Sequence, residues 1–128
     1  MITMNLAIEV AATTAKDVYV PVPVRGIVSA AYAVYSEETD LDETINIQRA
    51  TTSVNLITPP ADATAEGVTI TGVPDTTNKA LVFDPDSATV ANKVMKISMP
   101  NTFDTAGMIG LKILYDDSAY IAQAAKEA

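Results

Sequence analysis

The sequence contains no cysteine, no histidine and no tryptophan among its 128 residues. Without cysteine, disulfide bonds and thiolate metal ligands are excluded. Without histidine, the chain lacks the base of Ser-His-Asp and Cys-His catalysis and the commonest ligand for transition metals. We therefore expect neither an enzyme nor a bound cofactor. Aromatic residues make up only 5% of the chain, so Val, Ile, Leu, Met and Ala must supply the core.

The formal net charge is −8, and the few cations are scattered along the chain. Because an acidic surface repels phosphate groups, we expect no binding to nucleic acid. No apolar run reaches the roughly 18 residues of a transmembrane helix, so we expect no membrane segment. The first five residues lack the basic region of a signal peptide, which predicts a protein made and used without export.

Apolar and polar residues alternate with a period of two along most of the chain, which is typical of strands with one buried face. Such alternation occupies residues 4–10, 18–24, 45–48, 53–56, 95–99 and 109–115. Turn residues separate these runs, as in the Thr-Pro-Pro-Ala-Asp sequence at 58–62. The pattern predicts a single all-β domain over residues 1–128, an antiparallel β-sandwich of the jelly-roll or immunoglobulin-like kind with about eight short strands.

Each end of the chain has two possible interpretations. Residues 1–16 are interpreted as an N-terminal arm or strand. Residues 117–128 are interpreted as a tail or a short helix, which Asp117 or Ser118 would cap and which Lys126 would end.

The sequence Pro-Val-Pro-Val at 21–24 affects only one of the two edges of a strand. The N–H groups of residues i and i+2 in a strand point to the same edge, so Pro21 and Pro23 remove two donors from one edge and leave the other intact. This predicts an edge strand or a strand that leaves the sheet. The prolines either blunt the edge against unwanted pairing or mark a specific docking edge.

The stretch from Gly26 to Tyr35 is apolar on both faces and predicts a central strand, with a strand covered on both sides by an assembly partner as the alternative. Simple alternation assigns Val28, Tyr32 and Val34 to one face and Ile27, Ala31 and Ala33 to the other.

Five acids crowd into residues 37–43 between two strand-like runs: Glu37, Glu38, Asp40, Asp42 and Glu43. They do not form an EF-hand, because the sixth residue counted from Asp40 is Ile45 rather than Gly and the twelfth is Thr51. A wet loop also does not suit the paired carboxylates of a glycosidase, one of which needs a raised pKa. We expect a solvated hairpin tip that tucks Leu41 inward, with a looser calcium site as the alternative.

The segment GIVSAAYAVYSEETDLDETINIQRATTSVN resembles a pattern found in small capsid decoration (cement) proteins of phages. In that pattern a two-faced strand meets a polar tip and two further strands follow. DSATVANKVMKISMP resembles the later amphipathic strand of these proteins, and GLKILYD resembles their closing strand. The resemblance covers residues 18 to 116 and rests on strand order and loop character.

This resemblance implies a structural virion protein on the capsid exterior, where it stabilises the contacts between capsomers without catalysis. Its partners would be the major capsid protein and further copies of itself, as a dimer or trimer. The predicted contact residues come from the N-terminal segment, the Pro21–Val24 edge and the two-faced strand. They are Met4, Leu6, Ile8, Pro21, Pro23, Val28, Tyr32 and Val34.

Two other classes of protein fit the same composition. One is a carbohydrate- or receptor-binding module of a phage fibre or cell-surface appendage, against which the low aromatic content counts. The other is a pilus- or surface-layer-type subunit, which would require export.

Overall fold

The computed structural model describes residues 1–39, 42–60 and 66–118. Almost all regular structure in these residues is β-strand, with one short 3-10 helix, η1 (Val90–Lys93). The strands are β1 (Ile2–Val10), β2 (Lys16–Pro21), β3 (Ile27–Tyr35), β4 (Ile45–Arg49), β5 (Thr52–Ile57), β6 (Thr69–Thr71), β7 (Val73–Pro74), β8 (Val94–Met99) and β9 (Gly107–Asp116). No helix in the described part of the chain is long and apolar enough to cross a membrane.

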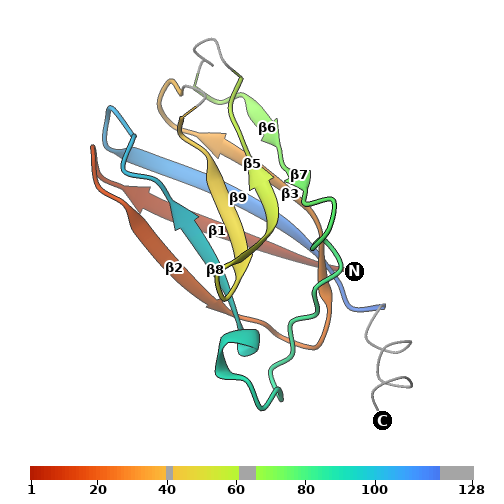
Figure 1. Ribbon diagram of the computed structural model, residues 1–128. Coiled ribbons are helices and arrows are strands. Elements are labelled where there is room, and N and C mark those ends of the chain that lie inside the picture. Colours follow the sequence, from red (N-terminus) through yellow and green to blue (C-terminus); the bar gives the residue numbers. More distant parts are fainter. Residues whose placement is uncertain (40–41, 61–65, 119–128) are drawn as a thin grey trace.

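The strands form two antiparallel sheets that pack face to face as a β-sandwich (Figure 1). One sheet has four strands in the order β1-β9-β3-β6, and the other has five in the order β2-β8-β4-β5-β7. The predicted antiparallel β-sandwich is therefore confirmed.

The first and last strands are neighbours in the four-stranded sheet. β1 and β9 pair in register from Ile2 opposite Tyr115 to Val10 opposite Gly107, without a bulge. β9 also pairs with β3 on its other side, so it lies at the centre of this sheet. Residues 2–10 and 107–115 are thus joined by a continuous ladder.

One lateral side of the sandwich is closed by a strand that changes sheets. β6 pairs with β3 in one sheet, and after Gly72 the chain continues as β7, which pairs with β5 in the other. A Cβ atom on Gly72 would collide with the side-chain oxygen of Asn55 and would lie 3.0 Å from the Ala31 carbonyl oxygen. Only glycine fits this corner without displacing its neighbours.

The core is built mainly from aliphatic side chains, as the composition predicts. Tyr115 and Phe83 are the two largest of the fully buried side chains among the described residues, with ring centroids 6.5 Å apart. The Tyr115 hydroxyl donates to the Val24 carbonyl at 2.6 Å, and Gly26 and Phe83 exchange backbone hydrogen bonds of 3.0 and 2.8 Å. These contacts tie the loops at one end of the sandwich to β9.

β3 is a central strand, as predicted, but its faces differ from the simple alternation. The register with β9 shifts between Val28 and Ala30, which is a β-bulge at Ser29. Because the extra residue reverses the alternation, Val28 lies on the same buried side as Ala31 and Ala33. The assignment of Val28 to the outer face with Tyr32 and Val34 is wrong, and Val28 belongs to the core.

β1 directs its alternating apolar side chains toward the core. Ile8 is buried, so its prediction as a surface contact is also wrong, because β9 and the opposite sheet cover it. Met4 and Leu6 pack against the core but are only partly buried. The predicted C-terminal helix lies mostly in residues 119–128, outside the described residues.

Candidate functional site: the outer face of the four-stranded sheet

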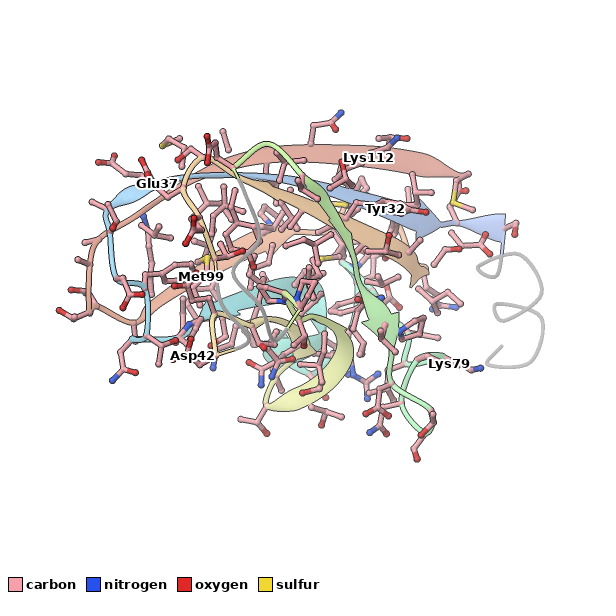
Figure 2. All side chains as sticks on the ribbon, turned by 90° about the horizontal axis from the view of Figure 1, so that it is seen from above. Tyr32, Glu37, Asp42, Lys79, Met99 and Lys112 are labelled. Carbon is pink, nitrogen blue, oxygen red and sulfur yellow. The ribbon has the colours of Figure 1, made fainter. Side chains whose placement is uncertain are left out.

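The outer face of the four-stranded sheet is the candidate site. The strand register places residues from β1, β9, β3 and β6 in rows across this face. One row runs Asn5, Lys112, Tyr32, Thr71, and the next runs Ala7, Gly110, Val34, Thr69. Figure 2 shows Tyr32 and Lys112 on this sheet, which lies along the top of that view.

A shallow hollow lies where Gly110 interrupts these rows. Because glycine has no side chain, the surface sinks between Val34 and its neighbours, and the hollow has a volume of about 500 Å³. We call it the Gly110 hollow and define it by Asn5, Tyr32, Val34, Thr69, Gly110 and Lys112, which line it together with Leu6 and Leu111.

The hollow combines apolar contacts with a polar rim. Val34, which lines the hollow, is 36% exposed. Met108 lies outside the hollow, in the next row of the sheet beside Glu9, and is 44% exposed. Lys112 supplies a positive charge to the rim, and Asn5 and Thr69 supply uncharged polar groups. Such a surface binds by shape and burial of apolar groups, and its side chains do not include a paired acid and base.

The acidic stretch after β3 is not a hairpin tip. β3 belongs to the four-stranded sheet and β4 to the five-stranded sheet, so the connection crosses one end of the sandwich. Figure 2 shows Glu37 and Asp42 at this end, with Glu37 near the four-stranded sheet and Asp42 near the other. The prediction of a hairpin tip was wrong, because alternation along two strands does not reveal that they pair with different neighbours.

The acids of this connection have different surroundings. Glu37, Glu38 and Asp42 are exposed, whereas Glu43 is only 2% exposed. The Glu43 backbone carbonyl accepts a hydrogen bond of 3.0 Å from the Tyr35 hydroxyl. Burial, and to a lesser extent the negative charge of Glu43, raise the pKa of Tyr35 above its ordinary value. Glu43 is therefore part of the packed end of the sandwich and not a solvated acid.

Within residues 1–39, 42–60 and 66–118, no group of three or more Asp or Glu side chains is placed to hold a metal ion. The predicted calcium ligands Glu37, Glu38, Asp42 and Glu43 do not converge in that part of the chain. Asp40 and Leu41 lie outside the described residues. The calcium alternative has no support from the residues that are described.

The Pro-Val-Pro-Val segment lies at a sheet edge, as predicted. Among the described strands, β2 pairs only with β8, and it ends at Pro21. The Val22 N–H donates to the Lys93 carbonyl at 3.4 Å, so even-numbered residues of β2 face β8. Pro21 and Pro23 therefore face away from the sheet, and the donors that they lack are missing from the free edge.

Sequence reasoning placed Tyr32 and Val34 at the candidate surface but missed Gly110 and Lys112. The available signal was a glycine in the middle of an alternating strand, since such a glycine often marks a close approach of another group. Comparison with protein-family models, curated proteins and solved structures finds no match to this chain.

Proposed function

We propose that this chain is a non-catalytic structural protein that binds the outer surface of a phage capsid and stabilises the contacts between capsomers. The resemblance of residues 18 to 116 to capsid decoration proteins is one support. The observation that carries the proposal is the outer face of the four-stranded sheet, where Tyr32 and Val34 lie beside the Gly110 hollow. Its partner is the major capsid protein.

The chemistry of this face suits a protein partner. Exposed apolar side chains at the centre and polar groups at the rim are the usual arrangement of a protein interface. A modest contact suffices for each copy, because many copies bind symmetry-related sites on a shell. Binding to the assembled lattice and not to dissociated subunits raises lattice stability by mass action.

The test is co-sedimentation of the purified protein with phage heads from the same source, stripped of their exterior proteins. Wild-type protein is expected to saturate at a copy number related to the symmetry of the head. Val34→Lys puts a charge into the Gly110 hollow and is expected to abolish binding. Val73→Lys, at a valine that is 66% exposed on β7 of the other sheet, is the matched control and should bind normally.

Failure of wild-type protein to bind either expanded or unexpanded heads would overturn the proposal. Equal loss of binding in both valine variants would show that the Gly110 hollow is not the contact. Loss of binding in the presence of a chelator would indicate that binding depends on a metal ion, with the acids at residues 37–43 as its candidate ligands.

A carbohydrate-binding module is the second candidate. It is favoured by the Tyr32 ring next to Asn5, Thr69 and Lys112 in one hollow, since sugars bind to aromatic faces flanked by hydrogen-bonding groups. A glycan array distinguishes the two functions: specific hits that Tyr32→Ala removes, together with no binding to heads, would select this candidate.

A further inference from the structure

The sandwich has four lateral strand edges, and three of them are protected. β7 has only two residues and includes Pro74, and β6 has three residues before its chain crosses to the other sheet. β2 carries Pro21 on its free side. Short strands and prolines of this kind prevent pairing with other chains.

β1 is the exception. It is nine residues long, forms one edge of the four-stranded sheet and pairs with β9 without a bulge. Its residues from Ile2 to Ile8 include no proline, no glycine and no charged side chain. A long and regular edge, free of charged side chains from Ile2 to Ile8, is the type to which another strand adds most readily.

The backbone groups that β1 presents at this edge follow from the hydrogen bonds of the sheet. The Ser36 N–H donates to the Met108 carbonyl at 2.9 Å, so Met108 and every second residue of β9 after it face β3. The intervening residues, such as Leu111 opposite Leu6, face β1. The β1 residues that direct their N–H and C=O groups away from the sheet are therefore Thr3, Asn5, Ala7 and Glu9.

One end of this edge is already occupied. The Lys16 Nζ donates to the Glu9 carbonyl at 2.7 Å. Among the residues that the structure describes, the free backbone groups of this edge are thus those of Thr3, Asn5 and Ala7, and Asn5 lies at their centre.

The side chains of β1 also differ between its N-terminal half and its C-terminal end. Ile8 and Val10 are buried, whereas Ile2, Met4 and Leu6 are only partly buried. The half of the strand with free backbone groups is also the half whose core-facing apolar side chains remain accessible to water. An added strand would cover both.

We propose that β1 pairs antiparallel with β1 of a second copy of this chain, about a two-fold axis at Asn5. The two four-stranded sheets then form one continuous sheet of eight strands. In this pairing, odd-numbered residues must face odd-numbered residues and even-numbered residues must face even-numbered ones. Only then do the outer faces of the two sheets lie on the same side of the joined sheet. The inference does not depend on the proposed function.

The sequence of β1 is complementary to itself in this register. Asn5 faces Asn5 of the second copy, and each amide offers both a donor and an acceptor. Met4 faces Leu6, which places apolar groups together on the core side, and Thr3 faces Ala7 on the outer side. No two like charges face each other, although the whole chain carries a net charge of −8. Two copies of this acidic protein therefore repel each other less when they meet at this edge than when they meet through other, negatively charged parts of their surfaces.

Because the chain has no cysteine, one introduced cysteine reports only on contact between copies. In a hydrogen-bonded antiparallel pair the Cα atoms are about 5.5 Å apart, within the range that a disulfide spans. Asn5→Cys is expected to form a covalent dimer on mild oxidation of dilute protein. The matched control is Thr71→Cys, exposed in the same row of the same sheet but on β6, and it should stay monomeric.

Sedimentation equilibrium of the full chain gives the Kd of the wild-type dimer. Asn5→Lys places two ammonium groups face to face at the axis and is expected to raise this Kd at least about tenfold, because like charges opposed at an interface repel each other. Thr71→Lys should leave the Kd unchanged. Circular dichroism and thermal melting establish that each variant is folded.

The proposal fails if the wild-type protein is monomeric at all accessible concentrations. It also fails if folded Asn5→Lys dimerises as well as wild type, or if Thr71→Cys cross-links as efficiently as Asn5→Cys. Capture of β1 by the capsid protein alone, with no self-association, would likewise reject it. Binding to heads in the co-sedimentation experiment is measured separately, so the two proposals succeed or fail independently.

Discussion

The phenolic oxygen of Tyr115 lies 2.6 Å from the carbonyl oxygen of Val24 and 3.4 Å from that of Phe83. One hydroxyl on β9 thus contacts two loops, the one that precedes β3 and the one that precedes β8. Tyr115→Phe keeps the ring and removes the hydrogen bond, which leaves the partly buried Val24 carbonyl without this donor. We expect a loss of about 1–2 kcal/mol in the free energy of unfolding, measured by urea denaturation. Tyr19→Phe, at a residue 61% exposed, should change it by less than about 0.5 kcal/mol.

Gly72→Ala tests the corner where the chain crosses between sheets. The added Cβ would collide with the Asn55 amide and with backbone and side-chain atoms beside it. We expect destabilisation of about 1–3 kcal/mol, as for other overpacked sites. Gly110→Ala is the control, because its nearest neighbour would be the Val34 carbonyl oxygen at 3.8 Å. Equal effects of the two substitutions would show that Gly72 is not sterically required.

Replacing both Pro21 and Pro23 with threonine restores two N–H donors to the free edge of β2. We expect little change in thermal stability, since neither ring is buried, but increased concentration-dependent aggregation measured by light scattering. Pro100→Thr, outside the strands, is the control. Unchanged scattering of the double variant would mean that the prolines do not protect this edge.

The ion pair between Arg25 and Asp84 makes part of the stability depend on pH. The Arg25 Nη2 lies 2.8 Å from the Asp84 Oδ2, and the Asp86 N–H donates to the Asp84 Oδ1 at 2.9 Å. The hydrogen bond from Asp86, and then the bond and charge of Arg25, lower the pKa of Asp84 below its ordinary value of 3.8.

A lowered pKa in the folded state stabilises the protein above the unfolded pKa, and this contribution is lost as the pH falls through the folded pKa. We therefore expect Asp84→Asn to be less stable than wild type at neutral pH, and the difference to shrink on acidification below pH 3.8. Denaturant titrations at several pH values measure this difference in the free energy of unfolding. Asp104→Asn, at an exposed acid, serves as the control, and a difference that does not vary with pH would contradict the prediction.

Thr13 has φ of 56°, the left-handed region that β-branched residues rarely adopt. Thr13→Gly relieves this strain and keeps the backbone hydrogen bond of 2.8 Å to the Phe103 carbonyl. The relief of about 1–2 kcal/mol exceeds the entropic cost of glycine, so we expect a gain of up to about 1 kcal/mol in stability. Thr14→Gly, where no positive φ exists, should not stabilise, and a loss of stability in Thr13→Gly would refute the argument.

The sequence alone predicts the sandwich because each long strand carries its own alternation. β1, β8 and β9 are recognisable from their apolar positions, and Pro21 identifies an edge from the chemistry of one residue. The short strands β6 and β7 are not recognisable, since two or three residues contain too little of any period.

The faces of β3 and the nature of the acidic connection depend on partners distant in the sequence. Nothing in the local pattern marks Ser29 as a bulge, yet the bulge moves Val28 into the core. Glu43 is buried because the chain leaves one sheet for the other at that end, which strand alternation does not reveal. The Gly110 hollow likewise exists only because β1, β9, β3 and β6 bring their residues into rows.

The pairing of β1 with β9 has a consequence for how the chain acquires its structure. As a ribosome releases the protein from its N-terminal end, β1 emerges early but its only neighbour in the sheet emerges after every other described strand. The four-stranded sheet can close only after β9 is made, and such a distant pairing is slow to form. Until then β1 is a long amphipathic strand without its partner in the sheet, and unpaired strands with exposed apolar side chains are prone to aggregate.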